Sequence, residues 1–378
     1  MKKNLSILIY SLASGGAERV VSILLNELKE NYNITLILMN KTIFYNIPTG
    51  VCIEYLENSL VDESGMKKFF KLPFLGWKYK NICKKKSISV SLSFMNRPNY
   101  INIFSKIIGN KSKIIISERA MPSLQHQNGL QGFINRFLIK LLYSKSDIAT
   151  ANSLGNSLDL IDNFHIDKIT TINNPFDIKE IEKLSNDDIK LLSNDFKFIS
   201  VGRLDSGKNH KLMINAIKNI AAKLYIIGDG ELRGELETQI EELKLDKKVF
   251  LLGKQINPYK YLAKADCFVF SSNHEGFPNV LLEALACGLP IISTDCKSGP
   301  REILSPKSDM KSHLIDKIEL SEYGILTPVN DKIYLVEAMK LMQADKRLRD
   351  NYIQKAKSRA SNFNKDTIIK GWIKVIEN

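Results

Sequence analysis

Residues 271–295 read SSNHEGFPNVLLEALACGLPIISTD, and no other stretch of the chain is as informative about the architecture. The apolar run at 266–272 has the length and composition of a buried strand, and 290–294 suits the next strand. Between them, Pro278 suits the first turn of a helix and Gly288 suits its exit. A strand, a helix and a second strand in this order predict a parallel α/β sheet, whose carboxyl edge is where ligands bind.

Two glutamates of this stretch stand eight positions apart, on either side of the expected helix start. Glu275 falls in the loop that leaves the first strand. Glu283 falls on the helix, four residues after Asn279 and on the same helical face. The helix N-terminus can hold a phosphate, and the carboxylates can hold hydroxyls. For Glu283 alone, an ordinary solvated helix is an equal alternative.

The same alternation of strands and helices runs through all 378 residues, which suits two domains of ordinary size. The polar stretch at 179–195 can link them, and the tail at 364–377 has an amphipathic helical pattern around Trp372. The expected strands of the two halves are at 5–10, 34–39, 87–93, 113–117 and 147–151, and at 196–201, 223–227, 249–252, 267–271 and 291–293.

A second motif, GRLDSGK at 202–208, follows the first strand of the second half. Arg203 and Lys208 are cations on a glycine-containing loop, so they can clamp a diphosphate and offset charge on a leaving nucleotide. An exposed loop with ordinary basic residues is the alternative.

Three further loops follow expected strands. Gly228 lies in a Gly-Asp-Gly turn, and Lys254 lies in the stretch LLGKQ at 251–255. Gly15 and Gly16 precede a helix, and glycine allows the backbone to approach a ligand closely. The Gly-Asp-Gly turn and the Gly-Gly loop are each also typical of a plain tight turn.

Together the motifs resemble retaining glycosyltransferases of family 4. The resemblance rests on the Glu-x7-Glu block and on VGRLDSGKNH, YSLASGGAERVV, NRPNY at 96–100 and NPYKYLAK. It implies the GT-B fold, in which two Rossmann-like α/β domains face each other across a cleft. We therefore expect an acceptor domain at 1–175, a nucleotide-sugar domain at 176–362, and a final helix at 363–378 that crosses back to the first domain.

The resemblance also implies roles for individual residues. Many relatives have a histidine in the loop where this chain has Glu118 and Arg119, so its role is in doubt here. The expected catalytic residues are Glu275, Arg203 and Lys208; the donor-binding residues are Gly15, Gly16, Gly228, Lys254, Gly276, Phe277, Asn279, Val280 and Glu283; and the acceptor-binding residues are Arg97, Glu118 and Arg119.

Within the family, the shared stretches indicate transferases that add N-acetylgalactosamine to lipid-linked oligosaccharides in bacterial N-glycosylation. The implied reaction transfers a HexNAc, with GalNAc as the first choice, from a UDP-sugar to an undecaprenyl-diphosphate-linked glycan with retention. No Asp-x-Asp triplet occurs, so we expect neither a metal nor any other cofactor. An O-antigen or capsule transferase of the same fold, with another sugar, is one alternative. The other is a non-catalytic nucleic-acid-binding protein, which the basic pI of 9.3 suggests but Glu275, Glu283, Arg203 and Lys208 argue against.

The chain has a net charge of +13, and residues 1–150 hold 21 Lys and Arg against nine Asp and Glu. Five cysteines without CxxC spacing favour a reducing cytoplasm.

The stretch 67–86, KKFFKLPFLGWKYKNICKKK, mixes lysines with aromatic residues, which suits an anionic membrane surface. The chain is thus expected on the cytoplasmic face of the inner membrane, as a peripheral protein. The residues expected to contact the membrane are Lys67, Lys68, Phe70, Lys71, Trp77, Lys78, Lys84, Lys85 and Lys86.

Two alternatives remain for this basic segment. One is a helix that packs its aromatic residues on the sheet. The other is an RNA-binding surface, but no RNA-binding fold signature accompanies it, so no nucleic acid is expected.

Overall fold

A computed structural model describes residues 2–58, 65–189 and 195–378. The chain divides into two compact units. Unit 1 comprises Met1–Pro175 together with Asp366–Asn378, and unit 2 comprises Phe176–Lys365. Each unit is built around its own sheet, with helices on both faces, as the alternating pattern predicts.

Unit 1 contains a parallel sheet in the order β3-β2-β1-β4-β5-β6-β7 among its described residues. The inner strands are buried on both faces because helices cover both, as is usual for parallel sheets. The strands are β1 (Lys3–Ile9), β2 (Tyr32–Leu38), β3 (Cys52–Tyr55), β4 (Val90–Phe94), β5 (Lys113–Glu118), β6 (Ile148–Ala151) and β7 (Ile169–Thr171).

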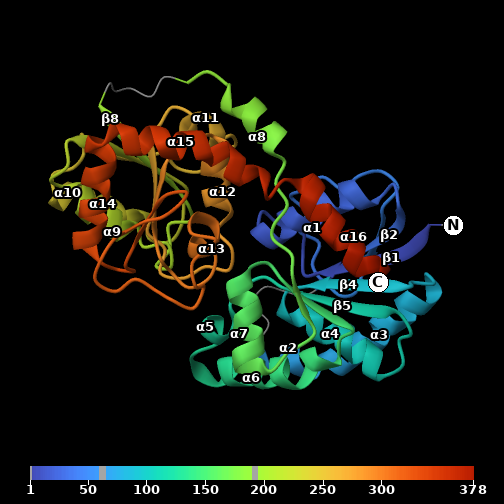
Figure 1. Cartoon of the computed structure of the whole chain (residues 1–378). Helices are drawn as coiled ribbons and strands as arrows, with labels where there is room; N and C mark the ends of the chain where they lie inside the picture. Colours follow the sequence, from blue (N-terminus) through green and yellow to red (C-terminus); the bar gives the residue numbers. More distant parts are fainter. Residues whose placement is uncertain (1, 59–64, 190–194) are drawn as a thin grey trace. The chain divides into compact units, whose positions relative to one another are not determined.

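The helices of unit 1 form two layers. One face of the sheet packs against α1 and α16, and the other packs against α3, α4, α6 and α7 (Figure 1). The helices are α1 (Gly16–Leu28), α2 (Gly65–Phe70), α3 (Leu72–Lys85), α4 (Asn96–Ile107), α5 (Pro122–Gln125), α6 (Gly129–Leu142), α7 (Leu154–Phe164) and α16 (Lys365–Glu377), with a 3-10 turn at Tyr143–Lys145.

Helix α16 completes the core of unit 1, although it is the last helix of the chain. Trp372 is fully buried, and its ring lies 5.6 Å from that of Phe94 on β4. Tyr32 donates a hydrogen bond of 2.6 Å to Glu377, and Lys113 donates one of 2.6 Å to the carbonyl of Val375. The C-terminal half of α16 is therefore tied to the unit that the chain began with.

Unit 2 contains a sheet in the order β10-β9-β8-β11-β12-β14-β13, in which the edge strand β13 is antiparallel to β14. Helices α9, α10 and α14 pack on one face, and α8, α11, α12 and α13 pack on the other. The elements are α8 (Ile178–Ser185), β8 (Phe196–Val201), α9 (His210–Ile217), β9 (Ala222–Ile227), α10 (Arg233–Glu242), β10 (Val249–Leu251), α11 (Tyr259–Leu262), β11 (Cys267–Phe270), α12 (Asn279–Ala286), β12 (Ile291–Thr294), α13 (Pro300–Leu304), β13 (Glu319–Leu320), β14 (Ile325–Thr327), α14 (Lys332–Ala344) and α15 (Lys346–Ser361).

The prediction that the polar stretch 179–195 links the two domains is partly wrong. Its first part belongs to α8, which Asp177 caps by accepting a hydrogen bond of 3.1 Å from the amide of Glu180. Ile181 anchors this helix because its side chain is buried in unit 2. Residues 190–194 of the expected linker lie outside the described residues.

Among the described helices, none combines the length and the apolar character that crossing a bilayer requires.

Candidate functional site

An ion pair between two loops lies at the carboxyl edge of the unit 2 sheet. The Lys208 Nζ atom lies 2.5 Å from Glu275 Oε1, and their side chains are 25% and 12% exposed. Lys208 follows β8 and Glu275 follows β11, and these two strands are neighbours in the sheet. The Lys208 ammonium also lies 5.5 Å from the centre of the Phe270 ring. The sequence predicts both residues as catalytic but does not predict that they pair.

Further hydrogen bonds fasten these two loops to each other. The Ser271 hydroxyl lies 2.9 Å from the carbonyl oxygens of both Lys208 and Asn209. The amide of Asn273 donates to the Gly207 carbonyl at 2.8 Å. The distance between the cation and the carboxylate is therefore set by the backbone as well as by their own attraction.

Arg203 extends into solvent from the loop that follows β8. Its side chain is 76% exposed, and its Nε atom lies 4.0 Å from Asp205 Oδ2. Asp205 also accepts a hydrogen bond of 3.0 Å from the amide of Lys208, which shapes the loop. A long, exposed guanidinium on a shaped loop is available to an anionic ligand.

Gly228 allows two loops of this edge to cross closely. Its φ is +142°, and a Cβ at this position would lie 1.9 Å from the carbonyl oxygen of Gly202. Gly230 has a similar restriction, since a Cβ there would lie 2.5 Å from the carbonyl oxygen of Leu204. Only glycine fits the first of these positions without a shift of backbone.

His210 is a residue of this edge for which the sequence suggests no role. It begins α9, is 3% exposed, and its Nε2 atom lies 3.2 Å from the carbonyl oxygen of Arg203. Burial lowers the pKa of His210 to about 4, so the ring is neutral at neutral pH and donates from Nε2. It holds the Arg203 backbone in place. The signal that the sequence offers is its place at the end of the stretch VGRLDSGKNH, two residues after Lys208.

Glu283 lies on α12 but is only 5% exposed. The hydroxyl of Tyr259, on α11, donates a hydrogen bond of 3.4 Å to Glu283 Oε1. The prediction that Glu283 lies on the helix after the Glu275 loop is thus correct in position. The solvated helix that the sequence leaves open as an alternative does not occur at this residue, because its carboxylate faces inward.

The residues expected near the start of α12 differ in accessibility. Gly276, Asn279 and Val280 are partly exposed, whereas Phe277 is buried against Phe363. The Gly276 carbonyl accepts a hydrogen bond of 2.6 Å from the Ser298 hydroxyl. Lys254 is exposed on the loop after β10. Donor binding by these residues stays a prediction.

In unit 1, Gly15 and Gly16 form the entrance to α1, at the end of the loop that follows β1. The Glu18 carboxylate folds back over Gly15 so closely that a Cβ there would lie 2.1 Å from Glu18 Oε2. Burial raises the pKa of the Glu18 carboxyl. The Gly15 backbone and the Glu18 carboxylate are thus in close contact at the start of α1.

The loop after β5 directs Glu118 into the protein. Its carboxylate accepts hydrogen bonds of 2.8 Å from the Tyr143 hydroxyl and 2.9 Å from the amide of Arg119, and the residue is 3% exposed. Arg119 donates to Asn174 Oδ1 and lies over the ring of Phe94. Both side chains stabilise this loop, and their acceptor contacts stay a prediction.

Arg97 lies at the start of α4, and its Nη1 atom lies 2.7 Å from Glu57 Oε1.

In the basic segment 67–86, the aromatic packing that the sequence leaves open applies to Tyr79, which is fully buried. Phe70 and Trp77 are instead 72% and 54% exposed. The lysines also differ. Lys67, Lys71, Lys84 and Lys85 are exposed, whereas Lys68, Lys78 and Lys86 are partly buried.

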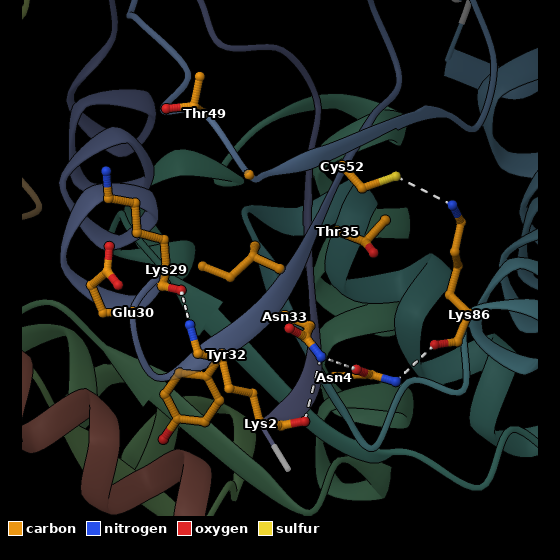
Figure 2. Close-up of a pocket in the computed structure, with 12 residues that line it drawn as sticks. Lys2, Asn4, Lys29, Glu30, Tyr32, Asn33, Thr35, Thr49, Cys52 and Lys86 are labelled. Atoms are coloured by element: carbon orange, nitrogen blue, oxygen red, sulfur yellow. Dashed lines mark hydrogen bonds between the residues drawn. The ribbon is translucent and has the colours of Figure 1, made fainter.

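A polar pocket of about 430 Å³ lies at the amino edge of the unit 1 sheet, where β1, β2 and β3 begin. Figure 2 shows that its polar groups bond to one another. Asn33 donates to Asn4 at 3.0 Å, Asn4 donates to the Lys86 carbonyl at 3.1 Å, and Lys86 donates to the Cys52 sulfur at 3.2 Å. Ligands of parallel sheets bind at the carboxyl edge, so this pocket is separate from the candidate site.

Within the described ranges, no three His, Cys, Asp or Glu side chains gather closely enough to hold a metal ion. The absence of a metal requirement stays a prediction.

Comparison with known proteins gives consistent matches. Residues 183–359 match the family model described as "Glycosyl transferases group 1". The chain is 42% identical, over 99% of both chains, to the N-acetylgalactosamine-N,N'-diacetylbacillosaminyl-diphospho-undecaprenol 4-alpha-N-acetylgalactosaminyltransferase of Campylobacter jejuni. It is 29% identical, over 98% of both chains, to an alpha-1,4-N-acetyl-D-galactosaminyltransferase of the same organism that is named for a GalNAc-GalNAc-diNAcBac-PP-undecaprenol substrate.

The fold also matches solved structures over its full length. HepE of Anabaena in complex with UDP aligns over 99% of both chains with a TM-score of 0.79 and 18% identity. At this identity the likeness describes the fold alone.

Proposed function

Because this chain belongs to the group 1 family of glycosyl transferases, we propose that it transfers N-acetylgalactosamine from UDP-GalNAc to a glycan linked to undecaprenyl diphosphate. The observation that carries this proposal is the 42% identity, over 99% of both chains, to a transferase named for that sugar and that lipid. We propose protein N-glycosylation as the pathway that uses the product.

The geometry of unit 2 supports the transfer step. As the bond between the sugar and the diphosphate breaks, negative charge develops on the leaving UDP. Lys208, anchored by its loop, and the exposed Arg203 can stabilise that charge. Held cations of this kind supply the electrostatic stabilisation that a metal supplies in other transferases, so we propose a metal-independent reaction.

Glu275 has a second task in this proposal. Its carboxylate pairs with Lys208, and the diphosphate of the donor is proposed to compete with it for the Lys208 ammonium. The Glu275 carboxylate is then available to accept hydrogen bonds from hydroxyls of the donor sugar. Glu283, beside Tyr259, is proposed to hold the ribose. We propose retention of the anomeric configuration, with a donor phosphate oxygen accepting the proton of the acceptor hydroxyl.

We further propose that the chain works at the cytoplasmic face of the inner membrane, as a peripheral protein. The exposed lysines and aromatic residues of α2 and α3 support this location, because the first attract anionic lipid and the second insert at the interface.

A panel of UDP- and GDP-sugars, incubated with a short-chain polyprenyl-diphosphate glycan, tests the proposal. We expect a mass gain of one or more HexNAc units with UDP-GalNAc, and an α-anomeric product by NMR. A product with another sugar on a different acceptor would instead favour the O-antigen or capsule alternative. Absence of transfer from every donor would contradict the proposed function.

A further inference from the structure

A continuous chain of side-chain hydrogen bonds runs through the interior of unit 1, between its sheet and the helices α3 and α4 (Figure 1). It consists of hydroxyl and amide groups that are each at most 1% exposed, and it ends on the Glu118 carboxylate. Polar groups cost free energy in a core unless they are partnered, and here each is. The members, in order, are Ser6, Tyr79, Ser91, Asn102, Ser93, Asn99, Tyr143 and Glu118.

The first half of the chain has a fixed direction. The Ser91 hydroxyl donates to Asn102 Oδ1 at 2.7 Å, so its single hydrogen is used. The Tyr79 hydroxyl, 2.6 Å from that of Ser91, is therefore the donor to it. By the same reasoning the Ser6 hydroxyl donates to that of Tyr79 at 2.8 Å. All of these donors point toward Asn102.

The second half continues in the same direction. Asn102 donates to the Ser93 hydroxyl at 3.1 Å, which donates to Asn99 Oδ1 at 2.8 Å. Asn99 then donates to the Tyr143 hydroxyl at 3.2 Å, and Tyr143 donates to Glu118 Oε2 at 2.8 Å. Hydrogen bonds aligned in this way polarise one another. Such a chain suits an ionised carboxylate at its end, because a carboxylate only accepts.

The Glu118 carboxylate uses its other oxygen to shape its own loop. Glu118 Oε1 accepts hydrogen bonds from the amides of Arg119 at 2.9 Å and Ala120 at 3.4 Å. Burial raises the pKa of the Glu118 carboxyl, and the hydrogen bond from Tyr143 acts against this increase. Arg119 and Tyr100, on α4, also interact with the carboxylate electrostatically. Glu118 is therefore an inward-facing anchor of the turn.

Arg119 follows this anchor at the carboxyl edge of β5 and is partly exposed. Its guanidinium donates to Asn174 and to the Ser117 hydroxyl, and it lies 5.8 Å from the centre of the Phe94 ring. These two bonds use two of the five N–H donors of a guanidinium. The others suit the hydroxyl and acetamido oxygens of a glycan.

We propose that Tyr143 is a positioning residue for the acceptor glycan. Through the Glu118 carboxylate it holds the loop from which Arg119 binds the glycan. The two residues that the sequence groups as acceptor contacts thus have different tasks, since Arg119 touches the glycan and Glu118 does not. The inference rests on the proposed function, because that function supplies a glycan as the ligand of Arg119.

The first test compares two buried tyrosines. Tyr143→Phe keeps the ring and removes the last donor of the chain, so the KM for a water-soluble glycan acceptor should rise about tenfold. UDP affinity by calorimetry should stay within about twofold of the wild type. Tyr100→Phe is the matched control, since its hydroxyl donates to Asn135 at 3.2 Å and its ring lies 6.0 Å from that of Tyr143. It should leave the acceptor KM unchanged.

The pH profile separates positioning from a general loss of stability. Tyr143→Phe removes a bond that lowers the pKa of Glu118, so the carboxylate is protonated, and the loop released, at a higher pH. The acid limb of kcat/KM for the acceptor should therefore move up by about one pH unit. Tyr100→Phe should not move it. An equal limb in both variants would overturn the proposal.

A double variant tests whether Tyr143 acts through Arg119. Arg119→Gln should itself raise the acceptor KM about tenfold, because it removes the proposed glycan contact. In that background Tyr143→Phe should add little, since the group that it positions is gone. Fully additive effects would overturn the proposal.

Trypsin tests the loop without any activity measurement. Cleavage after Arg119 in the folded, full-length chain should be several-fold faster for Tyr143→Phe than for Tyr100→Phe. Glu118→Gln replaces Tyr143→Phe if the latter melts early by circular dichroism. Faster cleavage without sugar transfer by the wild type would uphold the positioned loop and refute the proposed reaction. Transfer with the same acceptor KM and the same cleavage in both tyrosine variants would refute this inference alone.

Discussion

Lys208 and Glu275 are 67 residues apart in the chain, yet their charged atoms lie 2.5 Å apart at the carboxyl edge of the unit 2 sheet. The pair is partly buried and braced by backbone hydrogen bonds from the same two loops. This arrangement holds the Lys208 ammonium and the Glu275 carboxylate in fixed positions, where each neutralises the charge of the other.

Replacing Glu275 by Ala should lower turnover by about 100-fold or more, because the donor sugar loses a group that orients it. Lys211 and Glu235 form a matched control, since their charged atoms also lie 2.5 Å apart but both side chains are largely exposed. Glu235→Ala should leave turnover near that of the wild type. The measurement is steady-state kinetics at saturating donor, with circular dichroism to verify folding. Equal activity of the two variants would remove Glu275 from the site.

Arg203→Ala and Lys208→Ala should weaken UDP binding, since each removes a cation proposed to contact the diphosphate. A loss of about tenfold in affinity for each is expected, measured by calorimetry. Lys211→Ala serves as the control for loss of one charge. EDTA should not slow the wild type. Inhibition by EDTA that Mg²⁺ or Mn²⁺ reverses would contradict the metal-independent mechanism.

Gly228→Ala should destabilise unit 2 by roughly 2–4 kcal/mol, because the backbone has positive φ and the new methyl group meets the Gly202 carbonyl. The crossing of the two loops would then open and donor affinity would fall. Gly234, on α10, has open space around its Cβ position, so Gly234→Ala is the control. It should be neutral or up to about 1 kcal/mol more stable. Urea unfolding followed by circular dichroism distinguishes the two.

Stability should fall as pH decreases from about 6.5 to 4, with His210 as one contributor. Its pKa is depressed in the folded chain, so the unfolded chain binds more protons in this window, and stability rises with pH. The contribution amounts to up to about 3 kcal/mol and is complete above the unfolded pKa. His210→Gln should flatten this part of the pH profile. An unchanged profile would show that the folded ring accepts a proton readily.

Changing Lys84 and Lys85 to Ser should weaken sedimentation with anionic liposomes by roughly tenfold at low salt, because both lysines are exposed at the end of α3. Lys86 is left intact because Glu54 holds it at 3.0 Å. Replacement of Lys247 and Lys264, two exposed lysines of unit 2, gives the same loss of charge as a control. If both double variants bind alike, or if the wild type does not bind, the proposed membrane contact is wrong.

The sequence predicts the fold class well. The GT-B fold is confirmed by full-length similarity to a solved structure, and most strands lie where their apolar runs predict. The short strand β3 (Cys52–Tyr55) is missing from the sequence expectation because its residues are mostly exposed, so it has no buried run to reveal it. Helix α8 is missed for a similar reason, since a single buried residue, Ile181, anchors it.

The site is predicted less completely. Glu275, Arg203 and Lys208 stand out because carboxylates and cations in loops after strands suggest ligand contacts. Their pairing requires knowledge of which strands are neighbours, and sequence spacing does not contain it. The roles of His210 and of the Tyr259 contact to Glu283 depend on burial, which becomes visible only in three dimensions.

The position of α16 has a consequence for biosynthesis. Ribosomes release a protein from its N-terminus onward, and domains commonly fold in that order. Here the first unit to emerge lacks the helix that carries Trp372, and it receives this helix only after all of unit 2 has been made. Unit 1 therefore waits, with part of an apolar face of its sheet uncovered beside α1, until residues 366–377 have been made. A nascent chain stalled before residue 366 should thus need a chaperone on its first half, while its second half can already be native.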